Sequence, residues 1–145
     1  MTSTAAWSAL LRVYAALVPA LDHDLQAAHH TPLTWYDVLL ELNAAEDRQL
    51  TMSQLGAVAV VSRSRVSRVV DELVAAGLVE RVPHPADRRS AFARITPAGR
   101  SRLRAAAPTY LAGIERRFTS HLTEREAATI ATALQKVLQA QTPPS

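Results

Sequence analysis

The chain has 145 residues and a formal net charge of +3 at pH 7, and 48% of its residues are apolar while only 5% are aromatic. This size and composition favour one helical domain, and the absence of cysteine excludes disulfides, thiolate-zinc sites and cysteine redox sensing. No apolar run approaches the roughly 18 residues of a membrane span, and the N-terminus lacks a signal-type pattern, so we expect a soluble cytoplasmic protein.

The positive charge is concentrated in one segment of the chain. Eleven arginines and four acids lie between Arg48 and Arg104, a net charge of +7, whereas the remaining residues carry −4. All but one of the basic residues are arginine, the side chain suited to bidentate contacts with phosphate and guanine. Because phosphate neutralisation supplies most non-specific affinity, this distribution indicates nucleic-acid binding.

The first predicted element is a long helix over residues 1–30. Apolar residues recur at helical spacing from Trp7 to Leu25, and Pro19 should bend this helix without ending it, because the pattern continues in phase. A stripe of this length packs either on its own domain or on a second subunit.

The segment that follows the first helix is a connection, His29–Pro32. The side chains of His23, Asp24, His29 and His30 could ligate a metal, but they show no recognised ligand spacing. We therefore interpret the histidines as exposed loop residues and expect no metal site.

A second helix is predicted over Thr34–Ala45, with Thr34 as its N-cap. Its inner face is formed by four residues at helical spacing, Trp35, Val38, Leu39 and Leu42. The adjacent aromatic residues Trp35 and Tyr36 either pack in the core, which we favour, or line a cavity. A polar connection, residues 43–49, leads into the next helix.

Residues 51–77 predict two short helices joined by a tight turn. Thr51 and Gln54 form a capping box, and Ser62 offers a second cap. In the second helix an apolar face repeats at i, i+3, i+4, i+7 and i+8, formed by Val66, Val69, Val70, Leu73 and Val74. Gly77 occupies the position where a left-handed residue ends a helix, and Leu78 follows as in a Schellman motif.

The other side of this second helix is hydroxyl-rich and cationic in its first half. It carries Ser64, Ser67 and Arg68, flanked by Arg63 and Arg65. All three arginines lie in the first two turns, where they oppose the helix dipole and where stability alone would favour acids. This pattern is typical of a major-groove recognition helix, although an amphipathic surface helix is the alternative.

After Gly77 the pattern changes to two strands, Leu78–Val82 and Ser90–Thr96, joined by a tip with adjacent Arg88 and Arg89. A β-hairpin beside a recognition helix is a wing, and arginines at its tip could enter a minor groove. An ordinary solvated hairpin is the alternative.

Two helices close the chain. Thr96 caps the first, with Pro97 at its first position and Pro108 as an expected bend. Thr123 and Glu126 form a capping box for the last helix, whose apolar side consists of Ile130, Leu134, Val137 and Leu138. The tail, residues 142–145, is expected to fray.

This order of elements resembles the MarR (multiple antibiotic resistance regulator) family of bacterial transcription factors over essentially the whole chain. The resemblance is carried by SRSRVSRVVDEL from Ser62, AGLVER from Ala76, PADRRS from Pro85 and ARITPAG from Ala93. It implies a mainly α fold with a small β-wing in a single domain over residues 1–145. Residues 34–105 would form a winged helix-turn-helix, and residues 1–33 and 106–145 a helical dimerisation region.

The resemblance also implies roles for individual residues. Ser62, Arg63, Ser64, Arg65, Ser67 and Arg68 would contact the major groove, and Arg88 or Arg89 the minor groove. Asp87 would brace the wing through an ion pair. A small aromatic or anionic effector would bind between the two regions, near Tyr14, His30, Trp35 and Tyr36.

We therefore expect a homodimeric DNA-binding regulator, acting as a ligand-responsive repressor on a pseudo-palindromic operator. The alternative is a winged-helix protein–protein interaction module, for which the exposed arginines have no purpose. Ser62, His84 and Asp87 include the residue types of a catalytic triad, but no nucleophile elbow, phosphate loop or paired-carboxylate motif accompanies them. We expect neither an enzyme nor a cofactor.

Overall fold

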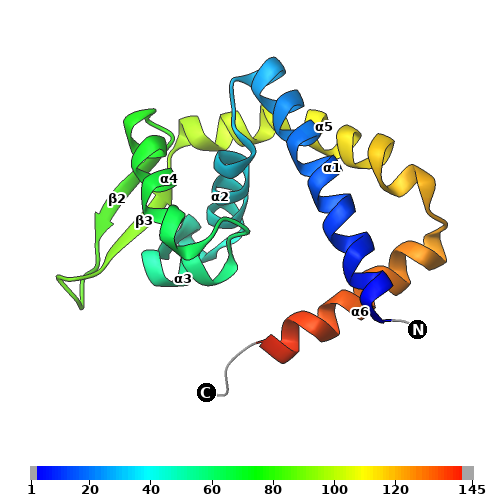
Figure 1. Ribbon diagram of the computed structural model, residues 1–145. Helices are drawn as coiled ribbons and strands as arrows, with labels where there is room; N and C mark the ends of the chain where they lie inside the picture. Colours follow the sequence, from blue (N-terminus) through cyan, green and yellow to red (C-terminus); the bar gives the residue numbers. More distant parts are fainter. Residues whose placement is uncertain (1–2, 142–145) are drawn as a thin grey trace. The chain divides into compact units, whose positions relative to one another are not determined.

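The computed structural model describes residues 3–141, which form a mainly helical fold with one small sheet (Figure 1). The helices are α1 (Ser3–His29), α2 (Leu33–Ala44), α3 (Met52–Val58), α4 (Arg63–Ala75), α5 (Pro97–Arg117) and α6 (Glu124–Gln141). The strands are β1 (Gln49–Thr51), β2 (Val79–Pro83) and β3 (Ala91–Ile95). The chain divides into two compact units, residues 1–110 and 111–145. The predicted fold class is confirmed.

The core of the first unit is built from the apolar faces that helical spacing predicts. Leu39 and Leu42 of α2 and Leu73 of α4 are fully buried, together with Leu25 of α1 and Leu55 of α3. Of the α4 valines expected on its inner face, Val66, Val69 and Val70 are buried and Val74 is partly buried. Burial of this face fixes the rotation of α4, so its other side is held toward solvent.

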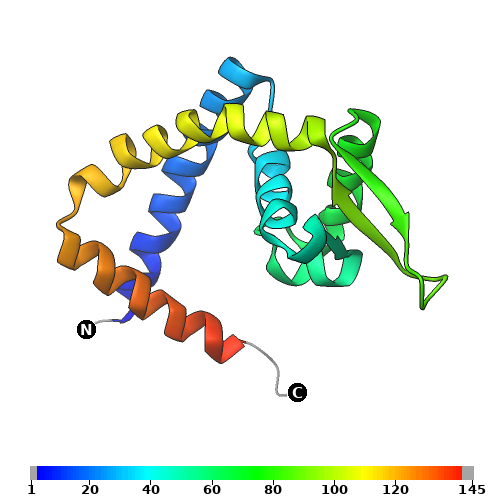
Figure 2. The same cartoon turned by 180° about the vertical axis from the view of Figure 1, so that it is seen from behind.

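The sheet is antiparallel, with the strand order β1-β3-β2. The hairpin of β2 and β3 matches its prediction to within a residue or two at each end, and both views show it extending away from the helices of the first unit (Figures 1 and 2). Strand β1 was missed, since Gln49 was assigned to a polar connection. It has three residues, too few to show an alternating pattern, and it pairs with β3 from Gln49 opposite Arg94 to Thr51 opposite Phe92.

Most of the predicted helix ends are confirmed. Thr51 and Gln54 form both hydrogen bonds of a capping box, and Thr123 and Glu126 do the same at α6. Gly77 has φ +77°, and the Leu78 N–H donates to the Leu73 carbonyl, as the Schellman motif requires.

Two predicted caps differ from the structure, one in its position and one in its hydrogen bond. Helix α2 begins at Leu33, so Thr34 lies inside it, and the Leu33 N–H donates to Asp22 Oδ1 at 2.8 Å. Ser62 occupies the N-cap position of α4, but its hydroxyl makes no capping bond and lies 3.3 Å from Ser64 Oγ. In the first case an acceptor from a distant segment satisfies the orphan donor, which local sequence cannot reveal.

Helix α1 continues through Pro19, as predicted, and divides into a buried and an exposed half. Leu21 and Leu25 are buried, whereas Trp7 is 61% exposed and Leu10, Leu11 and Tyr14 are exposed as well. By length and composition alone, Thr4–His29 would suffice to cross a membrane, and little of it is buried. The expectation that no such segment exists is therefore wrong. The helix has no long uninterrupted apolar run, but its few charged residues lie among many alanines and leucines, so its mean hydropathy is high.

In the second unit α6 follows a short helical turn, Thr119–His121. The helix has the apolar side that the sequence predicts, and Leu134, Val137 and Leu138 of this side are exposed. No residue of α6 is buried within the described part of the chain.

Candidate nucleic-acid interface

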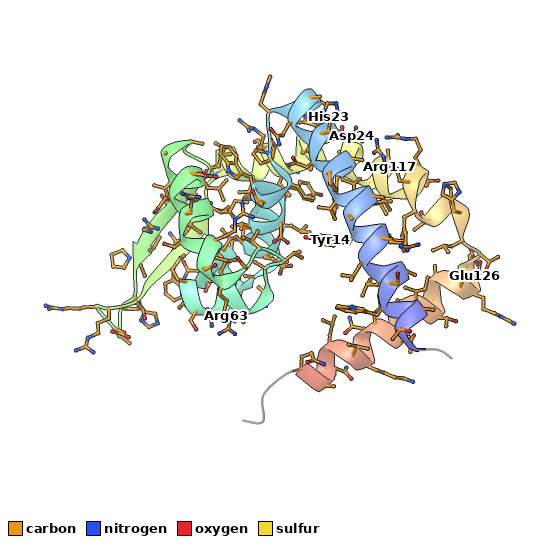
Figure 3. All side chains as sticks on the ribbon, viewed as in Figure 1. Tyr14, His23, Asp24, Arg63, Arg117 and Glu126 are labelled. Atoms are coloured by element: carbon orange, nitrogen blue, oxygen red, sulfur yellow. The ribbon has the colours of Figure 1, made fainter. Side chains whose placement is uncertain are left out.

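The exposed side of α4 presents the six residues that the sequence singles out. Val66 and Val69 face the core, and all of Ser62, Arg63, Ser64, Arg65, Ser67 and Arg68 are exposed. Figure 3 labels Arg63 at the start of α4. The hydroxyls and guanidinium groups are therefore gathered on the first two turns of one exposed helix.

Some arginines of the basic segment are bonded to other residues of the fold, and others are exposed without a side-chain partner among the described residues. Arg81 pairs with Asp71 at 2.7 Å, and Arg94 donates two hydrogen bonds to Gln49 Oε1, at 3.0 and 2.7 Å, so both hold the fold together. Within residues 3–141 no ion pair or side-chain hydrogen bond is formed by the five arginines on α4 and at the hairpin tip: Arg63, Arg65, Arg68, Arg88 and Arg89. These five guanidinium groups are exposed and remain free to bind an anion.

Three polar ties position α4 in the lobe. Asp71 connects it to β2 through Arg81, and Glu72 Oε1 accepts a hydrogen bond of 2.8 Å from Trp35 Nε1 of α2. Asp37 Oδ2 of α2 accepts the backbone N–H groups of Val60 (2.8 Å) and Val61 (3.4 Å) in the turn before α4. The orientation of α4 therefore depends on α2 and β2 as well as on its own valines.

The tip of the β2–β3 hairpin is a closed turn organised by Asp87. Its Oδ1 accepts the Arg89 N–H at 2.9 Å, and its Oδ2 accepts the Ser90 hydroxyl at 3.2 Å. The predicted ion pair of Asp87 is not formed among the described residues; the carboxylate braces the tip through these hydrogen bonds instead. Next to the tip the rings of His84 and Phe92 are stacked, with their centres 4.8 Å apart.

The first unit also contains a cavity of about 750 Å³ beside the turn that precedes α4. Its apolar lining comes from α1, α2 and the turn: Val18, Leu21, Leu33, Leu40, Val60 and Val61. Its polar lining includes Asp22, Asp37, Ser62 and Arg65. Ser62 and Arg65 thus belong both to the cavity wall and to the exposed side of α4.

Two of the four residues expected near an effector line this cavity, Tyr14 and Tyr36, and Figure 3 labels Tyr14 on α1. The other two do not. Trp35 donates a hydrogen bond to Glu72, and His30 follows the end of α1 with a left-handed φ of 52°. Sequence reasoning missed Tyr110 of α5, whose ring centre lies 4.5 Å from that of Tyr36. No local signal connects residues so far apart in the chain.

Burial changes the acidity of several groups around the cavity. It raises the pKa of Asp37, although the hydrogen bonds from Val60 and Val61 lower it in part. Burial, and then the neighbouring Asp37 carboxylate, raise the pKa of Glu41. Burial also raises the pKa of Tyr36 and of Tyr110, so both phenols stay protonated at neutral pH.

The histidines near the end of α1 are not assembled into a metal site. The described residues contain no group of three or more His, Cys, Asp or Glu side chains that could hold an ion. His29 instead lies 2.7 Å from the Thr109 hydroxyl, a contact that joins α1 to α5 within the first unit.

Comparison with known proteins gives consistent matches. The MarR family model matches residues 31–90. The Multiple antibiotic resistance protein MarR of Escherichia coli is 32% identical over 89 residues, 61% of this chain, and the chain spans 62% of that curated relative's length.

Two solved structures from Streptomyces coelicolor, both MarR family transcriptional regulators, resemble nearly the whole chain. AbsC is 30% identical with a TM-score of 0.85, covering 97% of this chain and 95% of its own. Sco3205, solved in complex with DNA, is 27% identical with a TM-score of 0.90, covering 100% of this chain and 92% of its own.

Proposed function

The chain belongs to the MarR family of DNA-binding transcriptional regulators, and we propose that it acts as a homodimeric, ligand-responsive repressor on a pseudo-palindromic operator. The observation that carries this proposal is the group of five exposed arginines without a partner in the described residues, three on α4 and two at the wing tip. The same arginines would have no purpose in a protein–protein interaction module.

Each winged helix would read one half of the operator. The first two turns of α4 would enter the major groove, where the exposed serines and arginines between Ser62 and Arg68 reach base edges, and α3 would lie against the backbone. Arg88 and Arg89 would enter the adjacent minor groove, where the negative potential is greatest. The two α4 helices of a dimer would lie about 34–36 Å apart, one turn of the duplex.

Dimerisation is supported by apolar surface that the single chain leaves open. The first half of α1 exposes Trp7, Leu10 and Leu11, and α6 exposes Leu134, Val137 and Leu138. We propose that a second copy covers both faces, with residues 1–33 and 106–145 forming the dimerisation region. We accordingly treat α1 as an interface helix of a cytoplasmic protein and not as a membrane span.

The cavity is the proposed effector site. A volume of about 750 Å³ suits a small organic molecule, and its wall includes Ser62 and Arg65 of the proposed DNA-reading surface. A ligand that prefers a different position of α4 would lower operator affinity by its differential binding energy. Proteins of this family regulate transcription and are not enzymes, and we assign no catalytic residue.

The test is binding to DNA from the region upstream of its own gene. Fluorescence anisotropy would compare this duplex with a scrambled one of equal length at several salt concentrations, and sedimentation would report the oligomeric state. We expect a dimer that prefers the upstream duplex by about a thousandfold or more. A monomer, or equal affinity for both duplexes, would contradict the proposal.

A further inference from the structure

The charges that line the cavity are unfavourable for an anionic effector. Among the described lining residues, Asp22 and Asp37 are acidic and Arg65 alone is basic. Arg65 is exposed on α4, whereas the two aspartates are half-buried. An anion entering the cavity would therefore approach two carboxylates and would find its single partner at the solvent-exposed side.

Asp22 and Asp37 differ in whether a carboxylate oxygen is left without a hydrogen-bond donor among the described residues. Both oxygens of Asp22 are occupied, Oδ1 by the Leu33 N–H and Oδ2 by Gln26 Nε2 at 2.6 Å. Asp37 uses only Oδ2, for Val60 and Val61, and no hydrogen bond is formed by its Oδ1 within residues 3–141. Asp37 thus lines the cavity with one carboxylate oxygen that has no hydrogen-bond partner within residues 3–141.

A like-charged neighbour makes a cation at this position favourable. Glu41 lies one turn after Asp37 on α2, and neither carboxylate forms an ion pair within the described residues. Like charges at this spacing repel each other in a helix. A positive group beside Asp37 would compensate both carboxylates, whereas a negative group would add a third charge of the same sign.

The aromatic lining provides the other half of a site for a cation. Three tyrosines line the cavity, Tyr14 of α1, Tyr36 of α2 and Tyr110 of α5. The rings of Tyr36 and Tyr110 are in contact, with an angle of 41° between their planes. Tyrosine faces attract cations and also pack against flat apolar ligands.

We propose that the cavity binds a cationic aromatic ligand, an amidine or protonated amine attached to a ring system, whose positive group binds Asp37 and whose rings pack against Tyr14, Tyr36 and Tyr110. The inference rests on the proposed effector role of the cavity and specifies the ligand class. Of the expected aromatic or anionic effector, it keeps the aromatic character and replaces the negative charge with a positive one.

Three probes of one shape test the sign of the charge: naphthalene-2-carboxamidine, naphthalene-2-carboxamide and 2-naphthoate. Their binding to the full-length protein without DNA would be measured by titration calorimetry. We expect the amidine to bind about tenfold more tightly than the amide, and the naphthoate most weakly. The Asp37→Asn variant retains an acceptor for Val60 and Val61 and should lose this preference, whereas Asp47→Asn, at an exposed site, should keep it.

Equal or tighter binding of the naphthoate, an amidine preference that survives in Asp37→Asn, or no binding of any probe would overturn the proposed ligand class. Operator binding is then measured separately with and without each probe. Release of DNA by the naphthoate alone would uphold the repressor while rejecting the cationic ligand. A specific amidine complex that leaves operator affinity unchanged would uphold the ligand class and reject ligand-responsive repression.

Discussion

Arg68 lies in the second turn of α4, exposed and without a side-chain partner in the described part of the chain. We expect Arg68→Ala to weaken operator binding by about 1–3 kcal/mol if the guanidinium reads a guanine, because a bidentate contact is lost. The measurement is an anisotropy titration at fixed salt. Arg104→Ala, which removes the same charge from an exposed position of α5, is the control, and equal affinities of Arg68→Ala and wild type would remove Arg68 from the interface.

The two wing arginines are expected to act through phosphate charge and groove potential. Replacing Arg88 and Arg89 together by alanine should reduce the slope of log K against log salt by about 2, since each contact with a phosphate releases a counterion. The slope is obtained from titrations at four or more salt concentrations. An unchanged slope would show that the wing stays off the duplex.

The exposure of these arginines could be predicted from the sequence because it depends only on one helix and one hairpin. The valine spacing of α4 fixes which side is buried, and the serines and arginines between Ser62 and Arg68 then fall on the exposed side. The partner of Asp87 was not predictable in the same way. A carboxylate in a tight turn can meet an arginine or the backbone, and the choice depends on the local geometry of the tip, which here brings the Arg89 N–H to 2.9 Å.

At the scale of elements, the entry of α5 packs closely against the end of α4. A Cβ at Gly99 would overlap the Leu78 carbonyl oxygen and lie 2.8 Å from Ile95 Cγ1. Since the first obstacle is backbone, we expect Gly99→Ala to destabilise the fold by about 1–3 kcal/mol or more. Urea unfolding measures the loss.

Gly56→Ala is the matched control for this effect. Gly56 lies inside α3, and an added Cβ would meet only the side chain of Arg63, at 3.4 Å. Alanine is the better helix former, so this variant should match wild type or gain up to about 1 kcal/mol. A Gly99→Ala protein as stable as Gly56→Ala would mean that the two segments separate easily.

The burial of Asp37 should make the stability of the fold depend on pH. Because burial raises the pKa of Asp37, the folded chain binds more protons than the unfolded chain at pH values between the ordinary and the raised value. The contribution of the Asp37 side chain to the free energy of unfolding is thus fully present below the ordinary pKa and is lost as the pH rises through the raised pKa.

Urea unfolding of wild type and Asp37→Asn over a pH series checks this sign. We expect the stability of wild type relative to the variant to fall as pH rises. A difference that grows in favour of wild type would show that the hydrogen bonds from Val60 and Val61 outweigh the cost of burial. Asp47→Asn removes a carboxylate from an exposed site and is the control.

Elements with a long periodic pattern were predictable, and those defined by distant partners were not. The 13 residues of α4 contain nearly four turns of repeating valine and leucine, which identifies both its face and its end. Strand β1 has three residues and exists because β3 pairs with it. The cavity likewise depends on residues of three helices, among them Tyr14, Tyr36 and Tyr110, lining one space, and its acidic lining was therefore not foreseen.

At the scale of the whole molecule, the exposed apolar faces should determine the assembly. Leu138 of α6 is 60% exposed in the single chain. If a second copy covers it, Leu138→Glu places a charge in an apolar interface and should shift the protein from dimer to monomer, with loss of operator binding. Analytical ultracentrifugation over a range of concentrations reports the change.

Gln139→Glu adds the same charge on the opposite side of α6 and should remain dimeric. Dissociation of both variants to the same extent would point to a general effect of charge on α6. If both variants remain dimeric, Leu138 does not lie in the dimer interface.

Ser62 and Arg65 serve the cavity wall and the exposed side of α4 at once. Changes at these two positions should therefore alter the response to inducer and the choice of operator together. A genetic screen for variants whose repression no longer responds to the effector should therefore return some variants with a relaxed preference for the operator. A lineage that acquires a new effector would have to change its operators at the same time.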